Sequence, residues 1–249
     1  MPRLPFVFAL VFVWCNAFAM VGGAAPASDA VARRVALIVG SRGNFCSGVA
    51  LARDLVLTAA HCVVPGADYK LVEYDEQRRP ILRDIAQIAR HPQFELSTLL
   101  AHRATADVAL LKLVRPADLV PALLAQPREP FAVGDRLLVA GYGVAVRGDG
   151  RTGGSVRIAT LSVTGQPSSL QLRLFDPGAP ATGGLGACTG DSGAPIFVPV
   201  EPLAVVGLVS WSTGPGLAAG CGGLTGVTPL ARYREWIVQQ AAKLGSPLS

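Results

Sequence analysis

Short apolar runs, each ended by turn-forming residues, are the feature of this sequence that most limits how the chain can fold. The runs are rich in Leu and β-branched residues, and Gly, Pro, Asn or Asp mostly separate them. Runs of this kind predict strands. The 28 glycines and 19 prolines are scattered without a repeat, so they indicate many turns rather than disorder. We expect strands at 35–39, 48–51, 55–59, 108–114, 136–140, 156–163, 170–174, 195–199 and 203–210.

Helical spacing is convincing only at the end of the chain, in the segment 230–244. Apolar residues recur there at Tyr233, Trp236, Ile237, Ala241 and Leu244, with charged residues on the other faces. The sequence therefore predicts an all-β fold that is followed by a C-terminal α-helix.

A proline-containing segment at 116–130 has few strand formers and predicts a connection between two halves of the fold. A site that takes residues from both sides of this connection would lie in the cleft between the halves, which is a common place for a binding or catalytic site.

The first 19 residues have the composition of a secretory signal peptide. Arg3 gives a positive start, 5–14 is almost entirely apolar, and Ala17-Phe18-Ala19 is a small-x-small cleavage pattern. The apolar stretch is too short for an ordinary membrane span, although an uncleaved anchor remains the alternative. We expect export to a periplasm or to the medium, no stable membrane anchor, and a mature domain at 20–249.

Removal of the leader takes Cys15 with it and leaves four cysteines, Cys46, Cys62, Cys188 and Cys221. An even number in an exported protein predicts two disulfides, and four cysteines allow three pairings. There is no Cys-x-x-Cys motif or Cys/His cluster in the sequence, so no zinc site is predicted.

Charge is distributed without a basic stripe, although the formal net charge is +5. A nucleic-acid-binding surface is therefore not predicted. Arg78 and Arg79 stand close to Glu73, Asp75 and Glu76, which predicts a solvated loop of mixed sign. Two glutamates in such a loop do not predict a metal site, and we expect no cofactor.

Two segments have the residue types that nucleophilic catalysis requires. His61 stands in Thr58–Cys62, directly after the apolar run 55–57. Ser192 stands in 188–195 with Gly190 and Gly193 on either side. Glycines in such positions allow the tight backbone that exposes a nucleophile and turns N–H groups inward.

Together with 107–113, these segments resemble the trypsin/chymotrypsin family of serine proteases. The order His61, Asp107, Ser192 is also that family's order, and the resemblance runs from about 20 to 237. It implies two packed six-stranded antiparallel β-barrels, at about 35–115 and 131–228, with a helix at about 230–244. It also implies a serine endopeptidase that acts on a protein or peptide substrate as a monomer. A protein inhibitor is the other partner that the family allows.

The resemblance implies a role for each residue of the site. His61 would be the general base and then the general acid, and Asp107 would orient it. Ser192 would attack the substrate carbonyl, the N–H groups of Gly190 and Ser192 would bind the oxyanion, and the Ser210 hydroxyl would support Asp107.

The resemblance also chooses among the three cysteine pairings. It implies a disulfide Cys46–Cys62 beside the histidine and a disulfide Cys188–Cys221 beside the substrate pocket, and each would contribute about 2–4 kcal/mol.

Activation in this family requires a free amino terminus that pairs with the aspartate before the nucleophile, here Asp191. Met20-Val21-Gly22-Gly23 matches the family's position for it and follows the predicted leader directly. We therefore expect that leader removal exposes the activating Met20. The alternative is a propeptide that is removed after Arg34. Ile38-Val39-Gly40 lies too close to Cys46 to serve, and it is expected to belong to the first barrel.

The pocket that receives the residue before the scissile bond (the P1 residue) is expected to have no charge. Gly186 and Ala187 would form its base, and Ser212 with Thr225 or Gly226 would form its walls. Without an aspartate at the base, Arg and Lys are not expected as P1 residues. A Thr225 wall would favour small or medium apolar side chains. The second functional hypothesis is a catalytically silent binding protein on the same fold.

Overall fold

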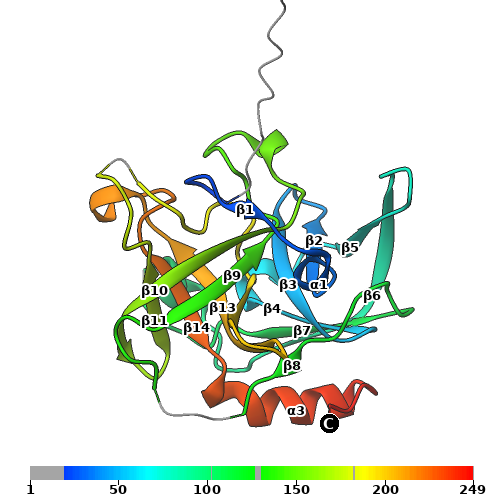
Figure 1. Ribbon diagram of the computed structural model, residues 1–249. Coiled ribbons are helices and arrows are strands. Elements are labelled where there is room, and N and C mark those ends of the chain that lie inside the picture. Colours follow the sequence, from blue (N-terminus) through cyan, green and yellow to red (C-terminus); the bar gives the residue numbers. More distant parts are fainter. Residues whose placement is uncertain (1–19, 102, 127–129, 182, 249) are drawn as a thin grey trace, which may run out of the picture.

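Two six-stranded antiparallel β-barrels with a C-terminal helix form the protein (Figure 1). The computed structural model describes residues 20–101, 103–126, 130–181 and 183–248. The predicted leader at 1–19 lies outside these residues. No helix in the described part of the chain is long and apolar enough to cross a membrane. The two barrels and the C-terminal helix confirm the architecture that the family resemblance implied.

The first barrel closes in the order β2-β3-β4-β7-β6-β5. Its wall encloses an apolar cluster that includes Ile38, Val56, Leu71 and Leu111, all with at most 1% of their surface exposed. The strands are β2 (Val35–Gly40), β3 (Phe45–Ala52), β4 (Leu55–Thr58), β5 (Tyr69–Tyr74), β6 (Pro80–Arg90) and β7 (Ala109–Leu113).

Strands β5 and β6 correct the sequence prediction of a solvated loop around Glu73. Glu73 belongs to β5, where it pairs in register with Ile81 of β6, and its carboxylate binds Arg83 of the same hairpin. Only Asp75–Arg79 forms the turn. The sequence pattern does not predict these strands because charged side chains on the exposed face interrupt the apolar run. A strand needs apolar residues only on the face that it buries.

The second barrel contains β9 to β14, with two short strands added at its edges. Strand β9 pairs with both β10 and β12, which closes the ring. Strand β1 (Ala25–Pro26) is added beside β10, and β8 (Leu123–Leu124) lies parallel to β13. The barrel strands are β9 (Arg136–Gly141), β10 (Arg157–Ser168), β11 (Gln171–Phe175), β12 (Pro195–Val198), β13 (Ala204–Ser212) and β14 (Thr225–Pro229).

The C-terminal helix α3 spans Arg234–Lys243 and follows a 3-10 turn at Ala231–Tyr233 (η4). It buries Ile237 and Ala241 as the spacing predicted. Two short helices, α1 (Asp29–Ala32) and α2 (Leu96–Leu100), and three further 3-10 turns, η1 (Ala60–Val63), η2 (Gly150–Thr152) and η3 (Pro215–Leu217), complete the chain.

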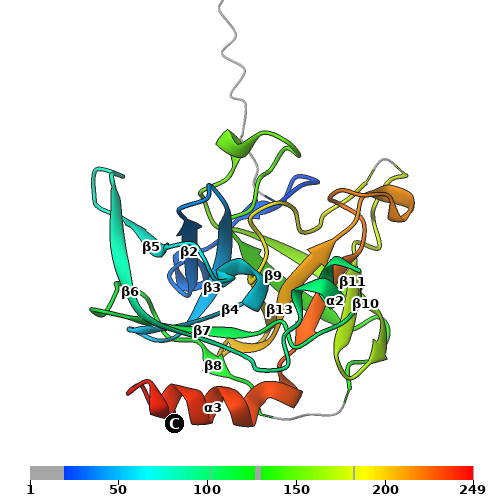
Figure 2. The same cartoon turned by 180° about the vertical axis from the view of Figure 1, so that it is seen from behind.

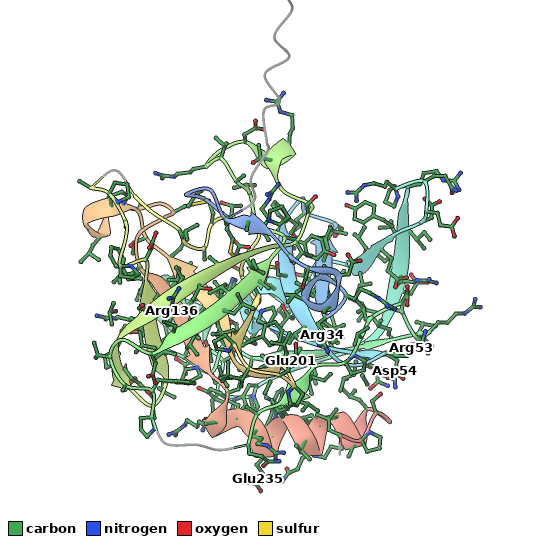
Figure 3. All side chains as sticks on the ribbon, viewed as in Figure 1. Arg34, Arg53, Asp54, Arg136, Glu201 and Glu235 are labelled. Carbon is green, nitrogen blue, oxygen red and sulfur yellow. A yellow bond between two sulfur atoms is a disulfide. The ribbon has the colours of Figure 1, made fainter. Side chains whose placement is uncertain are left out.

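Each end of the described chain contacts the more distant barrel. The N-terminal segment contacts the second barrel, and the C-terminal segment contacts the first. Near the N-terminus, β1 pairs with β10 of the second barrel before β2 begins the first. At the C-terminus, α3 lies along the side of the molecule where the two barrels meet (Figures 1 and 2). Beyond it, Ser246 donates to Asp54 of the first barrel (2.7 Å), and Lys112 binds both residues. Figure 3 labels Asp54 close to the end of this helix.

Candidate active site

The first barrel supplies His61 and Asp107 from the ends of adjacent strands. His61 lies in η1 after β4, and Asp107 lies two residues before β7, which pairs with β4. His61 Nδ1 is 2.8 Å from Asp107 Oδ2, and the His61 backbone N–H donates to Asp107 Oδ1 at 2.9 Å. These two contacts fix both the ring and the main chain of His61 against one carboxylate.

The second barrel contributes Ser210 from β13 to the same carboxylate. Its hydroxyl donates to Asp107 Oδ2 at 2.6 Å. Asp107 is only 1% exposed. Burial by itself would raise the pKa of Asp107, but the adjacent His61 and the hydrogen bonds from His61 and Ser210 together hold that pKa below its usual value. The carboxylate is therefore ionised at neutral pH, and it favours the tautomer of His61 that has its proton on Nδ1.

Ser192 lies between two glycines whose backbones are left-handed. Gly190 has φ +93° and Gly193 has φ +76°. A methyl group on Gly190 would lie 2.0 Å from the Phe45 ring, and one on Gly193 would lie 2.2 Å from Thr58 Oγ1. Both positions therefore require glycine for space as well as for conformation. Gly193 brings the Ser192 loop against Thr58, in the segment that leads into His61, and Gly190 brings it against Phe45 of β3.

The backbone N–H groups of Gly190 and Ser192 do not donate a hydrogen bond to any residue that the structure describes. They are available to an oxyanion, in the arrangement that stabilises a tetrahedral intermediate. The Ser192 hydroxyl makes no hydrogen bond to His61 Nε2, whose recorded contact within the described chain is Cys62 Sγ at 3.9 Å. Catalytic hydrogen bonds are often long without substrate.

Ser47 is a site residue that sequence reasoning missed. Its hydroxyl donates to Gly190 O at 2.8 Å and accepts from the Tyr142 N–H at 2.9 Å. Its N–H donates to Ser192 O at 2.8 Å. This serine of β3 thereby ties the nucleophile loop to the first barrel, a contact between residues about 145 positions apart that no local motif could reveal.

Two disulfides flank the site, and they join Cys46 to Cys62 and Cys188 to Cys221. The first connects β3 to the turn that holds His61. His61 and its two neighbouring sulfurs form a group of three metal-ligand atoms within 4.8 Å of one another. Both sulfurs belong to the disulfide, however, so they offer no thiolate to a metal ion.

Asp191 is completely buried next to the nucleophile. Its two oxygens accept from the N–H groups of Gly143 and Cys188, both at 2.9 Å. Burial raises the pKa of Asp191 to about 7. No cationic side chain in the described ranges pairs with it. A methyl group on Gly141 or Gly143 would lie 2.2–2.3 Å from this carboxylate, so the pair of glycines makes the space that it occupies.

Met20 lies in the same apolar cluster as Ala187 and Ala194, with none of its surface exposed. Val21 forms an isolated antiparallel bridge with Gly186. The start of the described chain is therefore inserted into the second barrel, close to the segment that contains Asp191.

A cavity of about 290 Å³ lies beside Ser192. Of the five residues expected to form the pocket, Ser212 lines this cavity. Gly186, Ala187, Thr225 and Gly226 are buried and do not line it. The residues that do are Arg147, Cys188, Thr189, Ser192, Val209, Trp211, Ser212, Gly220 and Cys221.

Thr225 and Gly226, the expected walls, are buried because they contact other parts of the protein. Thr225 Oγ1 accepts from the Ala187 N–H at 3.1 Å. A methyl group on Gly226 would lie 1.9 Å from the Trp211 ring. Arg147 was missed because it comes from the loop after β9, far from the other lining residues in the sequence.

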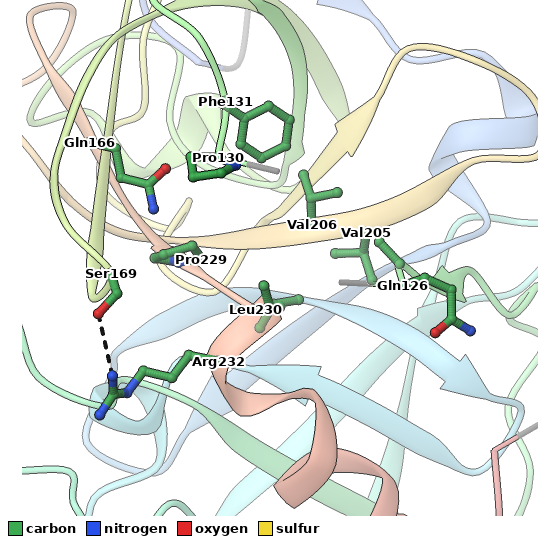
Figure 4. Close-up of a pocket in the computed structure, with 12 residues that line it drawn as sticks. Gln126, Pro130, Phe131, Gln166, Ser169, Val205, Val206, Pro229, Leu230 and Arg232 are labelled. Carbon is green, nitrogen blue, oxygen red and sulfur yellow. Dashed lines mark hydrogen bonds between the residues drawn. The ribbon is translucent and has the colours of Figure 1, made fainter. Parts of the chain in front are cut away.

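A second cavity lies on the second barrel, away from these residues (Figure 4). It is bounded by Gln126, Phe131, Val205 and Leu230, and Arg232 donates to Ser169 at its edge (3.3 Å). It contains none of the residues expected to take part in catalysis.

Comparison with known proteins gives consistent results. The family model described as Trypsin matches residues 20–237. A vitellin-degrading protease of Bombyx mori is 30% identical over 217 residues, which are 81% of this chain and 78% of that protein. Trypsin of Sus scrofa is 29% identical, over 90% and 96% of the two chains. Human heparin binding protein shares the fold with a TM-score of 0.67 at 24% identity, over 87% and 95% of the two chains.

Proposed function

This chain belongs to the trypsin family of serine proteases, and from that premise we propose that it is an exported serine endopeptidase with His61, Asp107 and Ser192 as its triad. The observation that carries the proposal is the continuous hydrogen-bonded series from Ser210 through Asp107 to His61. The segment that leads into His61 lies against the loop of Ser192, in which the N–H groups of Gly190 and Ser192 donate to no residue that the structure describes.

The proposed reaction passes through an acyl-enzyme. Ser192 Oγ attacks the peptide carbonyl carbon while its proton passes to His61 Nε2, and the carbonyl oxygen becomes an oxyanion. The N–H groups of Gly190 and Ser192 bind that oxygen, and one such donor is worth about 3 kcal/mol in the transition state. His61 then gives the proton to the leaving amine as the C–N bond breaks. Water then attacks the ester carbonyl while its proton passes to His61, and His61 gives that proton to Ser192 Oγ as the ester C–O bond breaks and the acid product leaves.

Specificity is proposed to exclude Arg and Lys as P1 residues, because none of the described residues that line the cavity beside Ser192 has a carboxylate. A cationic side chain would lose its hydration there without gaining a partner. The preference for small or medium apolar residues was based on a wall formed by Thr225. The Thr225 side chain is buried and does not line the cavity, so the lining gives this preference no support.

Activation is proposed to follow from leader removal alone. Cleavage before Met20 would create an ammonium group at a segment that is already inserted near Asp191. A cation there would favour the ionised carboxylate, which is otherwise held near a pKa of about 7 by burial. Cleavage after Arg34 is less well supported, because it would remove the buried Met20, Ala24 and Val31 from the core.

The partners proposed are a protein or peptide substrate and, as the family allows, a protein inhibitor. A monomer is expected to suffice because all of the proposed catalytic groups come from one chain. Export to a periplasm or to the medium is proposed from the leader at 1–19 and from the two disulfides. No metal or cofactor is part of the proposed mechanism.

A fluorophosphonate probe tests the endopeptidase directly. The protein, secreted with its own leader, should be labelled stoichiometrically and should hydrolyse peptide substrates. The Ser192→Ala variant should lose both properties while it keeps its cooperative unfolding. Amino-terminal sequencing of the labelled protein should begin at Met20. A start downstream of Arg34 would refute the activation proposal but leave the endopeptidase intact.

The alternative is a binding protein on the same fold. It is favoured by the absence of a hydrogen bond between Ser192 and His61 and by the similarity to structures of human heparin binding protein. Folded mature protein that resists the probe and hydrolyses no peptide would support this alternative. Retention on immobilised heparin would then be the next measurement.

A further inference from the structure

The cavity beside Ser192 has a positive charge at its rim. Arg147 lines it together with the hydroxyl-bearing residues Thr189 and Ser212. The guanidinium lies over the main chain of Gly220, where a methyl group would be 2.8 Å from Arg147 Nη1. Arg147 and Gly220 thus lie against each other in the lining of the cavity that also contains Ser192, although they come from different loops.

No acidic side chain in the described structure neutralises the charge of Arg147. The nearest acidic residue in the sequence, Asp149, accepts two hydrogen bonds from the Arg151 guanidinium, at 2.9 Å from Nε and 3.0 Å from Nη2. Arg147 forms no ion pair with any residue in the described ranges. A cation in this state attracts an anion that enters the cavity.

The hydrogen-bonding groups in the cavity also suit an anion. The Ser212 hydroxyl donates to Gly220 O at 3.0 Å, so its proton is already used. The Thr189 hydroxyl has no recorded partner in the described chain, and it can donate to a ligand. Together with Arg147 it offers donors but no negative charge, which is the environment that a carboxylate requires.

We propose that Arg147 selects an acidic P1 residue, so that the enzyme cleaves after Glu or Asp. The inference rests on the proposed endopeptidase activity and names the substrate class of that same site. It replaces the uncharged pocket that the sequence predicted. Arg147 acts here as a specificity-determining residue that binds the P1 carboxylate and takes no part in bond breaking.

The expected size of the effect follows from the exposure of Arg147. A hydrogen bond between charged groups at a partly solvated site favours a glutamate substrate over its neutral isostere by roughly tenfold. The preference should weaken as salt is added, because the pair is accessible to counter-ions.

The experiment compares kcat/KM for two peptides that differ only in having Glu or Gln as the P1 residue. The protein secreted with its own leader is used, at low salt, with a Lys peptide as a third substrate. The wild-type ratio of Glu to Gln should be about ten. In Arg147→Ala it should fall to about one, and in Arg147→Glu it should fall below one while the Lys peptide gains.

Arg151→Ala is the matched control, because it removes one positive charge from the same loop without touching the cavity. Its Glu-to-Gln ratio should stay near the wild-type value. A wild-type ratio near one, a ratio that survives in Arg147→Ala, or an equal loss in Arg151→Ala would overturn the assignment.

The fluorophosphonate probe separates this result from the parent proposal. Labelling together with hydrolysis of the Gln or Lys peptide in preference to Glu would overturn only the acidic preference. No labelling and no hydrolysis of any of the three peptides would overturn the endopeptidase and the acidic preference together.

Discussion

Adding one alanine ahead of Met20 should make the stability of this protein depend on pH in a way that the mature protein does not share. In the proposed mature protein, which begins at Met20, the extension would replace the free ammonium group with a peptide bond. Asp191 is then a buried carboxylate whose only recorded partners are two N–H groups, and burial places its pKa at about 7. In the unfolded chain an aspartate titrates near 3.9.

The difference between the folded and unfolded pKa values of Asp191 sets the sign and the size of the change in the free energy of unfolding with pH. The folded, extended protein holds a proton on Asp191 that the unfolded chain has already released at pH 5 or 6. The resulting stabilisation is fully present below about pH 4 and is lost as the pH rises to about 7. At 1.36 kcal/mol for each pKa unit, the shift of about three units amounts to about 4 kcal/mol. A domain of ordinary stability would survive this loss and remain measurable.

In the mature protein the Met20 ammonium group would keep Asp191 ionised in the folded state, and this contribution would be absent. Urea unfolding between pH 4.5 and 7.5, with Ser192→Ala in both proteins to prevent self-cleavage, measures the difference. The other carboxylates contribute equally to both and cancel. Asp191→Asn in the extended protein should remove the extra slope. Equal slopes in the extended and mature proteins would refute the proposed ion pair.

Three further perturbations test other parts of the site. Ser210→Ala removes the hydroxyl that donates to the buried aspartate at 2.6 Å, and kcat/KM for peptide hydrolysis should fall about tenfold; an unchanged value would exclude a supporting role. Gly190→Ala places a methyl group 2.0 Å from Phe45 at φ +93°. It should lower kcat at least 100-fold, on the order of the loss of one oxyanion donor, and normal turnover would contradict that role. Replacing Cys46 and Cys62 together by Ala should lower the free energy of unfolding in urea by about 2–4 kcal/mol; a change below 1 kcal/mol would show that the disulfide does little for stability.

Strands that bury both faces, or that present a continuous apolar run, could be predicted from the sequence. Strand β14 could not, because Thr225–Pro229 contains a glycine and a proline and has one large apolar residue, Val227. All five of its residues are nevertheless buried, since β11 and β13 pair with it on either side. Tertiary context here outweighs intrinsic propensity.

Some parts of the site could likewise be predicted from the sequence, and others could not. His61 and Ser192 could be proposed from a few residues around each, because their chemistry depends on local backbone geometry. The cavity could not, because its lining joins Arg147 to Gly220, which lie more than 70 positions apart, and no spacing rule relates them. The expected walls follow from the family resemblance, which gives positions along the chain and does not report which side chain faces the cavity.

The crossing of both chain ends has a consequence for how the molecule moves. Strand β1 fastens the N-terminal segment to the second barrel, and Ser246 fastens the C-terminal segment to the first through Asp54 and Lys112. The two halves are thus held together at both ends of the described chain. Moving the two halves apart would require both the pairing of β1 with β10 and the contacts of Ser246 to be broken. A frame of this kind keeps the groups that come from the two halves in register.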